Sequence, residues 1–293
     1  KVGDYVISDK GIPVKVTGVF PQGEKDIYEV IMNDGSKTES CDEHLWFTQT
    51  YTDRKNSSYK ILNNKRIYKK NPKNGTVKTL KEIKDTIYAL KNSKYKTLNH
   101  HIPIVEPVNF NKRDILISPY IIGLLIGDGC MLHNSVNLTS ADKFINEHFE
   151  NYINNNFDNL KIRKVIDDNK KCITQYVSKV NNHSQKEFNK FLENIRFYNL
   201  EKNSQNKFIP KDYLLNTIDN RLELLKGLMD SDGFINKSSL CYNTISKKLK
   251  DDFCFLINSL GGTYSVRSRM TKYTYKNILK NYINPESSKM LSK

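Results

Sequence analysis

The sequence predicts an α+β protein in which a small β-rich part precedes a larger part made of two matching halves. Residues 2–48 contain short stretches of alternating apolar and polar residues separated by Gly-containing turns, a pattern typical of antiparallel strands. Residues 118–293 twice show an apolar helix, strands, an amphipathic helix and further strands. A repeat of this kind, about a hundred residues long, indicates pseudo-twofold symmetry.

The β-rich part is expected to form strands over residues 4–8, 14–20 and 26–32. Residues 51–100 are polar, and within them the stretch 79–91 predicts a helix. Residues 101–107 contain two prolines and therefore predict an extended connector.

The larger part opens on an apolar helix, because Ser118 can act as its N-cap and Pro119 suits the first helical position. The first half continues with a strand at 136–139, a helix at 141–154, two strands within 161–177 and a helix at 187–198. The second half comprises a helix at 221–229, a strand at 239–245, a helix at 247–260 that Gly261 and Gly262 end, and a strand from residue 263.

These elements divide the chain into three segments. We expect a first domain over residues 1–100, in which about 51–100 form a basic insert, and a linker over 101–117. The second domain covers 118–293, with repeats at about 118–220 and 221–293.

Positive charge is concentrated in the insert and linker. The whole chain carries a net charge of +15, and residues 51–117 alone hold 16 Lys+Arg against 5 Asp+Glu. Lys69 and Lys70 lie in this stretch, with tyrosines between the basic residues. Such a segment favours a polyanion partner, because lysine contacts with phosphates release counterions. The alternative is a basic surface that only faces solvent.

Composition disfavours several other classes of protein. The longest apolar stretch, 115–126, is interrupted by Ser118 and Pro119 and is too short to span a bilayer, and no secretory leader opens the chain. Five scattered cysteines without a C-x-x-C pair predict neither a disulfide framework nor a zinc finger, and fit a reducing interior. The chain begins with Lys1 rather than Met, which indicates a fragment or a processed product.

The two apolar helices share a pattern of small residues. Gly123 and Gly127 are four residues apart in the first helix, as are Gly227 and Ser231 in the second. Residues at this spacing lie on one helix face, so two such faces can approach closely. Both helices end in Asp-Gly, where we expect the glycine to adopt the left-handed cap conformation.

The aspartates of these motifs are the strongest candidates for chemistry. If the helices pack in parallel, Asp128 and Asp232 meet at one end, where they repel each other and the negative helix dipoles. A hard divalent cation with oxygen ligands would compensate this charge, and Mg²⁺ held in this way beside a basic surface suits phosphodiester hydrolysis. The alternative is that Asp-Gly only caps two core helices, but two copies in matching repeats favour a site.

At these residues the sequence resembles the two-motif LAGLIDADG homing endonucleases, over residues 118 to about 275. The lead-ins 117–120 and 208–210 and Arg221 are part of the resemblance, whereas Ile126 departs from the first acidic letter of the motif that Asp230 matches. The resemblance implies αββαββα halves joined at the motif helices, with a saddle-shaped sheet that binds double-stranded DNA. It implies that Asp128 and Asp232 are catalytic. The implied metal site comprises Asp128, Asp232, Gly127 and Ser231, and weaker candidates for DNA contacts are Lys69, Lys70, Arg267, Arg269 and Lys272.

The first fifty residues resemble the Hint domain of inteins. The stretch 3–6 is similar to the end of the first splicing block, and 34–46 is similar to the block with a T-x-x-H motif, in which Cys41 replaces the threonine. His44 would then assist the N-to-S acyl shift, since a histidine changes charge near neutral pH. The alternatives for His44 are a strand-edge residue or half of a metal site with Cys41. The chain has neither the N-terminal nucleophile nor the C-terminal splicing block, so we expect no splicing of this chain by itself.

Together these patterns predict a site-specific, Mg²⁺-dependent homing endonuclease embedded in an intein. Its expected partners are double-stranded DNA and the exteins of a host protein, and it should be a monomer in the cytoplasm of a bacterium or of a phage- or virus-infected host. Two alternatives stay open: a splicing element with a degenerate endonuclease, and a non-cleaving nucleic-acid-binding protein similar to a maturase.

Overall fold

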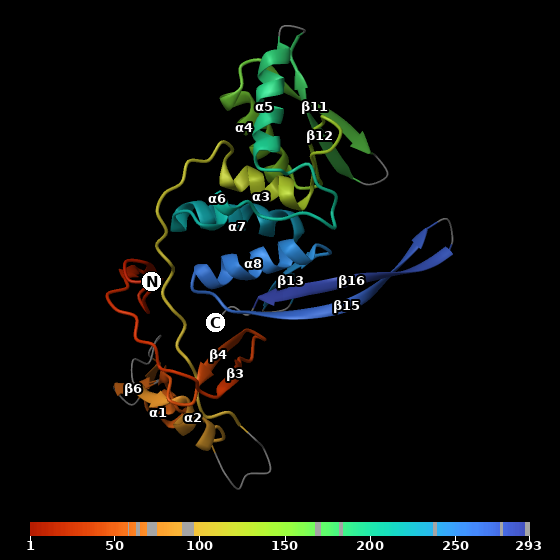
Figure 1. Cartoon of the computed structure of the whole chain (residues 1–293). Helices are drawn as coiled ribbons and strands as arrows, with labels where there is room; N and C mark the ends of the chain where they lie inside the picture. Colours follow the sequence, from red (N-terminus) through yellow and green to blue (C-terminus); the bar gives the residue numbers. More distant parts are fainter. Residues whose placement is uncertain are drawn as a thin grey trace. The chain divides into compact units, whose positions relative to one another are not determined.

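The computed structural model describes residues 1–57, 59–62, 65–68, 75–89, 97–167, 171–181, 184–236, 239–275 and 278–290. The chain divides into two compact units, which are treated separately below (Figure 1). Unit 1 comprises Lys1–Asp9 and Val14–Val105, and unit 2 comprises Lys10–Pro13 and Glu106–Lys293. Both helices and strands are present, which confirms the mixed fold class. Within the described ranges, no helix has the length and hydropathy needed to cross a membrane.

Unit 1 consists of short antiparallel strand pairs and two short helices. The pairs are β1 (Tyr5–Ile7) with β2 (Pro13–Lys15), β3 (Ile27–Ile31) with β4 (Lys37–Cys41), β5 (Leu45–Thr48) with β8 (Thr76–Thr79), and β6 (Tyr59–Leu62) with β7 (Lys65–Tyr68). The helices are α1 (Tyr51–Ser57) and α2 (Leu80–Asp85). Apolar side chains such as Ile27 and Ile31 on β3 stay exposed, because a two-stranded sheet has little surface to cover them.

Helix α2 is shorter than the predicted helix over 79–91. It begins in a capping box formed by Thr79 and Glu82, which satisfies its first amide groups. It ends at Asp85, and from there the chain pairs with another segment: the amide of Asn99 donates to the carbonyl of Ile87 at 2.8 Å. The prediction was wrong in length because this backbone pairing is not visible in the local pattern.

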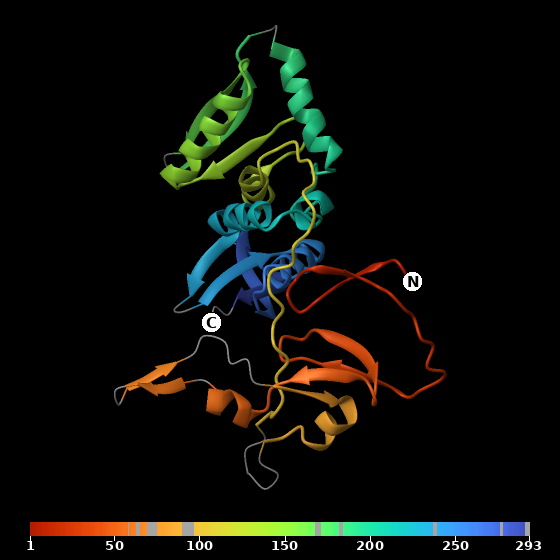
Figure 2. The same ribbon diagram turned by 90° about the vertical axis from the view of Figure 1, so that its left-hand side faces the viewer.

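The first half of unit 2 has the order αββαββα. Its elements are α3 (Pro119–Gly127), β9 (Gly129–Cys130), β10 (Asn137–Ser140), α4 (Lys143–Asn156), β11 (Leu160–Asp167), β12 (Cys172–Lys179) and α5 (Gln185–Phe197). The four strands form one antiparallel sheet in the order β11-β12-β10-β9. Helix α4 packs along this sheet (Figure 2), and its Ile145, Phe149 and Ile153 are buried.

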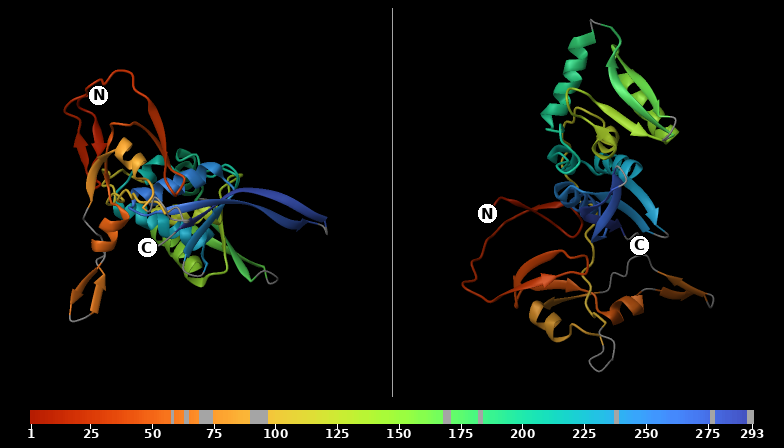
Figure 3. Two further views of the ribbon diagram at one scale, coloured as in Figure 1. Left: turned by 90° about the horizontal axis from the view of Figure 1, so that it is seen from below. Right: turned by 90° about the vertical axis from the view of Figure 1, so that its right-hand side faces the viewer.

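The second half repeats this topology. After the short α6 (Lys211–Leu214), it comprises α7 (Ile218–Asp232), β13 (Gly233–Asn236), β14 (Ser239–Thr244), α8 (Lys247–Ser259), β15 (Tyr264–Tyr275) and β16 (Ile278–Met290). Its sheet has the order β13-β14-β16-β15, so the first, second, fourth and third strands are neighbours, as in the first half. The β15–β16 hairpin projects from the helices (Figure 3). As predicted, Gly261 ends α8, with a φ of 76°.

The motif helices α3 and α7 form the centre of unit 2. Every residue of α3 from Tyr120 to Ile126 is buried, and α3 packs against α7 along its length (Figure 1). A Cβ atom added to Gly123 would lie 2.6 Å from the carbonyl oxygen of Leu224, and one added to Gly227 would lie 2.1 Å from that of Tyr120. These distances are shorter than any van der Waals contact, so the helix backbones touch where side chains are absent.

Arg221 at the start of α7 is fully buried and joins three segments of unit 2. Its guanidinium donates to the backbone oxygens of Asn216 (3.0 Å), Ser259 (2.7 Å) and Val108, and to Ser259 Oγ (2.6 Å). It also lies 4.8 Å from the ring centre of Phe110. Burial lowers its pKa to about 10. The hydrogen bonds compensate the lost hydration of the charge and hold the connector against the second half.

Candidate active site

The ends of α3 and α7 bring the two motif aspartates together. Asp128 is the C-cap of α3, and Asp232 is the last residue of α7. A Cβ atom added to Gly127 would lie 1.9 Å from Ser231 Oγ and 3.5 Å from Asp232 Oδ2. The same ends of both helices therefore face each other, and each supplies one carboxylate.

All four small residues of the motifs lie at this helix contact. Gly123, Gly127 and Gly227 have no room for a side chain toward the opposite helix. Ser231 is small, and its hydroxyl donates to the carbonyls of Gly227 (2.9 Å) and Leu228 (3.0 Å) of its own helix. Its polar group is therefore satisfied within α7 and needs no partner on the opposite helix. The spacing in the sequence thus produces the close approach that places the aspartates.

The glycines after the aspartates do not adopt the left-handed conformation that we expected. Gly233 has a φ of −85° and a ψ of 155°, and Gly129 does not have a positive φ either. A Cβ atom would lie 2.3 Å from the carbonyl oxygen of Met229 at Gly233, and 2.5 Å from that of Leu125 at Gly129. The prediction was wrong because the chain passes directly from helix to strand at both positions. Glycine is needed there for close backbone approach rather than for a positive φ.

The two carboxylates lie in an environment that disfavours their ionisation. Burial raises the pKa of Asp232 to about 6, and the negative charge of Asp128 contributes to this rise. Partial burial also raises the pKa of the Asp128 carboxyl. Two like charges at the negative ends of two helices are unfavourable without a cation, so the site is suited to a positive ligand.

The structure adds Lys207 to this cluster, a residue that the sequence patterns did not indicate. Its ammonium donates to the carbonyl oxygens of Gly127 at 2.5 Å and Gly129 at 3.2 Å. Burial lowers the pKa of Lys207, while the charges of Asp232 and Asp128 raise it. Lys207 directly precedes the lead-in 208–210. Its position beside the lead-in could have pointed to Lys207. However, about eighty residues separate it from Asp128, so the sequence does not show that the two lie close together.

Asp230, the other acidic residue of the second motif, has a different environment. The hydroxyl of Tyr120 on α3 donates to Asp230 Oδ2 at 2.7 Å. This bond crosses the helix contact, and burial together with Asp230 raises the pKa of the Tyr120 phenol. Asp230 therefore links the two halves.

The oxygen atoms at the helix ends fit a hard divalent cation. The carboxylates of Asp128 and Asp232 and the carbonyl of Gly127 are the kind of ligands that Mg²⁺ prefers. Among the residues that the structure describes, no group of three His, Cys, Asp or Glu side chains could hold a metal by itself. A cation here would need further oxygens from water or phosphate, which Mg²⁺ usually retains.

The other predicted site residues lie elsewhere or outside the described residues. Arg267 is exposed on β15, and Arg269 and Lys272 pair with Asn284 and Asn281 on β16, although the side chains of these two basic residues are not described. Lys69 and Lys70 also lie outside the described residues.

His44 belongs to unit 1, between β4 and β5, and so not to the unit of the aspartates. Its amide donates to the carbonyl of Cys41 at 3.2 Å, and its exposed ring meets Trp46 edge-on with centres 5.7 Å apart. The tight turn from Cys41 to His44 therefore brings these two residues of the predicted splicing block together.

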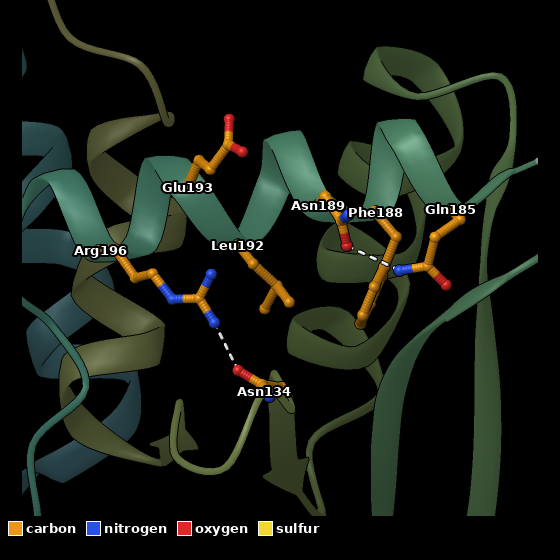
Figure 4. Close-up of a pocket in the computed structure, with 7 residues that line it drawn as sticks. All are labelled: Asn134, Gln185, Phe188, Asn189, Leu192, Glu193 and Arg196. Carbon is orange, nitrogen blue, oxygen red and sulfur yellow. Dashed lines mark hydrogen bonds between the residues drawn. The ribbon is translucent and has the colours of Figure 1, made fainter.

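A separate pocket of 310 Å³ lies between α5 and the turn after β9 (Figure 4). Arg196 donates to Asn134 across it, and Gln185 donates to Asn189 at 2.6 Å. Phe188 and Leu192 are its apolar members, and neither Asp128 nor Asp232 lines it. The paired carboxylates are thus in a different place from this pocket.

The ionisation of Asp232 should lower stability when no divalent cation is present. Its folded pKa of about 6 lies above the ordinary 3.8, so the folded protein binds this proton more tightly than the unfolded chain, and stability falls as the pH rises from about 4 to about 6. We expect Asp232→Asn to raise the free energy of unfolding by about 1–2 kcal/mol near pH 7. Melts in EDTA across this range measure the gain, which should vanish below about pH 4; a variant that is less stable than the wild type near neutral pH would contradict it.

Comparison with known families identifies a match in the second half of unit 2. Residues 219–288 match the LAGLIDADG-like domain family. The matched segment runs from the first turn of α7 to β16 and includes Asp232. It confirms a LAGLIDADG-like domain in the second half of unit 2.

Similarity to individual proteins is more distant. The replicative DNA helicase DnaB of Mycobacterium intracellulare is 26% identical over 262 residues, which are 89% of this chain and 39% of the helicase. The chain thus spans about two fifths of the length of that relative. Structures of the homing endonuclease I-DmoI, one of mesophilic variants and one in complex with DNA and Mn, are 18% identical. They cover 59% of this chain and 87% and 88% of theirs, with TM-scores of 0.37 and 0.35.

Proposed function

We propose that this chain is a site-specific endonuclease that hydrolyses both strands of DNA with Mg²⁺, and that it is a homing endonuclease embedded in an intein. The observation that carries the proposal is the meeting of Asp128 and Asp232 at the facing ends of α3 and α7. Each half of the repeat supplies one carboxylate, so a single chain has the symmetry to act on two strands, and a monomer suffices.

The residues at the helix ends have distinct tasks in this proposal. Asp128, Asp232 and the Gly127 carbonyl would hold the cation, and bound Mg²⁺ would activate water and stabilise the leaving oxygen of a phosphodiester. The contact through Gly123 and Gly227 fixes both aspartates on rigid helices. Lys207 adds a positive charge next to them, which suits a site that receives phosphate.

One face of the first sheet supports DNA as the substrate. On β11 and β12, Leu160 and Val177 face the core, so the alternate residues point the other way. Among them are Lys161, Arg163 and Tyr176, and Arg163 lies over the Tyr176 ring at 4.6 Å. A twisted antiparallel sheet with basic and aromatic side chains can contact phosphates and base edges in the major groove.

Cleavage of a randomised double-stranded DNA library tests the proposal. The full chain is incubated with the library in Mg²⁺ or in EDTA, and cut ends are sequenced. We expect cuts within one long sequence that require the cation. A wild-type protein that binds Mg²⁺ but leaves every library member intact would overturn the nuclease function.

The turn that joins Cys41 and His44 favours a second function, in protein splicing. Unit 1 would be part of a Hint domain, and the partial alignment with a much longer helicase supports an element inserted into a host protein. His44 would polarise the scissile peptide bond. The test is a precursor in the reducing bacterial cytoplasm, with the chain placed between flanking segments that supply an N-terminal nucleophile, a C-terminal splicing block and exteins. Ligated exteins from wild type and none from His44→Ala would support the role.

A further inference from the structure

The ammonium of Lys207 is hydrogen-bonded to an oxygen atom that a bound metal ion would use as a ligand. It donates to the Gly127 carbonyl at 2.5 Å, the same oxygen that the proposed metal site uses. Its second hydrogen bond goes to the Gly129 carbonyl, so the ammonium contacts the residues directly before and directly after Asp128. The charges of Asp232 and Asp128 both act on this lysine. Lys207 is therefore the resident cation of the cluster.

The backbone of Lys207 is held in place, so only its side chain is free to change position. Ser246, the N-cap of α8, donates its hydroxyl to the Lys207 carbonyl at 2.6 Å. Two residues further on, the amide of Ile209 donates to the buried Asp252 carboxylate at 3.0 Å. Helix α8 thus anchors the backbone at Lys207 and at Ile209, whereas the lysine stem has four flexible carbons.

We propose that Lys207 and the divalent cation compete for the oxygens at the end of α3, so that metal binding displaces the lysine ammonium from Gly127. This inference rests on the proposed metal site. An ammonium and a divalent cation repel each other at contact distance, and a cation that coordinates the Gly127 oxygen uses a lone pair with which this oxygen can accept the hydrogen bond from Lys207. Without metal, the lysine compensates the two carboxylates; with metal, its ammonium is released and becomes available to a phosphate.

Chemical labelling of lysines tests the displacement without DNA and without a substitution. The full chain is acetylated briefly with a water-soluble acylating reagent, with and without saturating Mn²⁺, and each lysine is quantified by mass spectrometry. We expect acetylation of Lys207 to rise at least about threefold with Mn²⁺, because the population of the released side chain increases. The exposed Lys211 should react equally in both samples.

Binding measurements give a second, independent readout. Titration calorimetry with Mn²⁺ should give Lys207→Met a dissociation constant several-fold lower than the wild type, because a competitor has been removed. Lys211→Met removes the same charge from a neighbouring exposed position and should bind Mn²⁺ like the wild type.

The outcomes separate this inference from the proposed function. If the wild type binds Mn²⁺ but Lys207 acetylation does not rise, the displacement is wrong and the metal site stands. If Lys207→Met binds Mn²⁺ no more tightly than the wild type, the competition is likewise refuted. If the wild type binds no Mn²⁺ at all, both the metal site and the inference fail. The labelling experiment uses only the wild type, so it decides the question even if the methionine variant does not fold.

Discussion

Replacing Asp232 by asparagine should lower DNA cleavage by at least about a thousandfold. The amide has nearly the same shape as the carboxylate, so the α3–α7 contact is retained. It lacks the negative charge that would hold the cation beside Asp128, and the charges around the reacting phosphate would be unbalanced. The measurement is single-turnover cleavage of the selected DNA site in Mg²⁺, together with Mn²⁺ affinity in the absence of DNA.

Asp230 provides a matched control on the same helix. Its carboxylate accepts a hydrogen bond from Tyr120 at 2.7 Å, and an asparagine oxygen can accept the same bond. We therefore expect Asp230→Asn to retain Mn²⁺ binding and most of the cleavage rate. The reverse result, an inactive Asp230→Asn beside an active Asp232→Asn, would show that the two acidic residues have been assigned the wrong way round.

The substitution Gly227→Ala should reduce the free energy of unfolding by about 3 kcal/mol. Its methyl group would lie 2.1 Å from the Tyr120 carbonyl oxygen and 3.0 Å from Gly123 Cα, so the two helices would have to separate. For a unit of this size such a loss lowers the melting temperature by roughly 6–12 °C. Urea unfolding followed by circular dichroism measures it.

The direction of the stability change in Gly227→Ala distinguishes the effect of helix packing from that of intrinsic helix propensity. In a helix without tertiary contacts, Gly→Ala is stabilising by about 1 kcal/mol. An exposed position of the same helix, tested with Leu222→Ala, should change stability little because this side chain is 41% exposed. A Gly227→Ala protein more stable than the wild type would mean that α3 and α7 do not touch at this point.

The local sequence was sufficient for most elements of unit 2. Ser118 and Pro119 mark the start of α3, and Gly261 marks the end of α8, where the structure has them. The small residues at four-residue spacing predicted a close helix contact, and the repeat predicted two matching halves. These features are readable because capping, periodicity and the absence of side chains act over a few neighbouring residues.

Other features depend on residues that are far apart in the chain. The helix predicted over 79–91 is shorter because residues 97–99 pair with residues 87–89. Gly129 and Gly233, by contrast, depend on near neighbours: each lies against the carbonyl of the residue four positions earlier and does not form a left-handed cap. Unit 1 alternates like strands, and the structure pairs these strands two by two, which leaves apolar side chains such as Ile27 and Ile31 exposed.

The sequence alone determined the two aspartates, their positions at the helix ends and the oxygen chemistry of the cluster. Only the tertiary structure decided that Lys207 joins them, because its place depends on how α8 holds residues 207–209 against the end of α3. Helices and strands follow from short-range preferences of the backbone. The charges that surround a carboxylate depend instead on packing between segments that are distant in the chain, and no pattern of neighbouring residues predicts that packing.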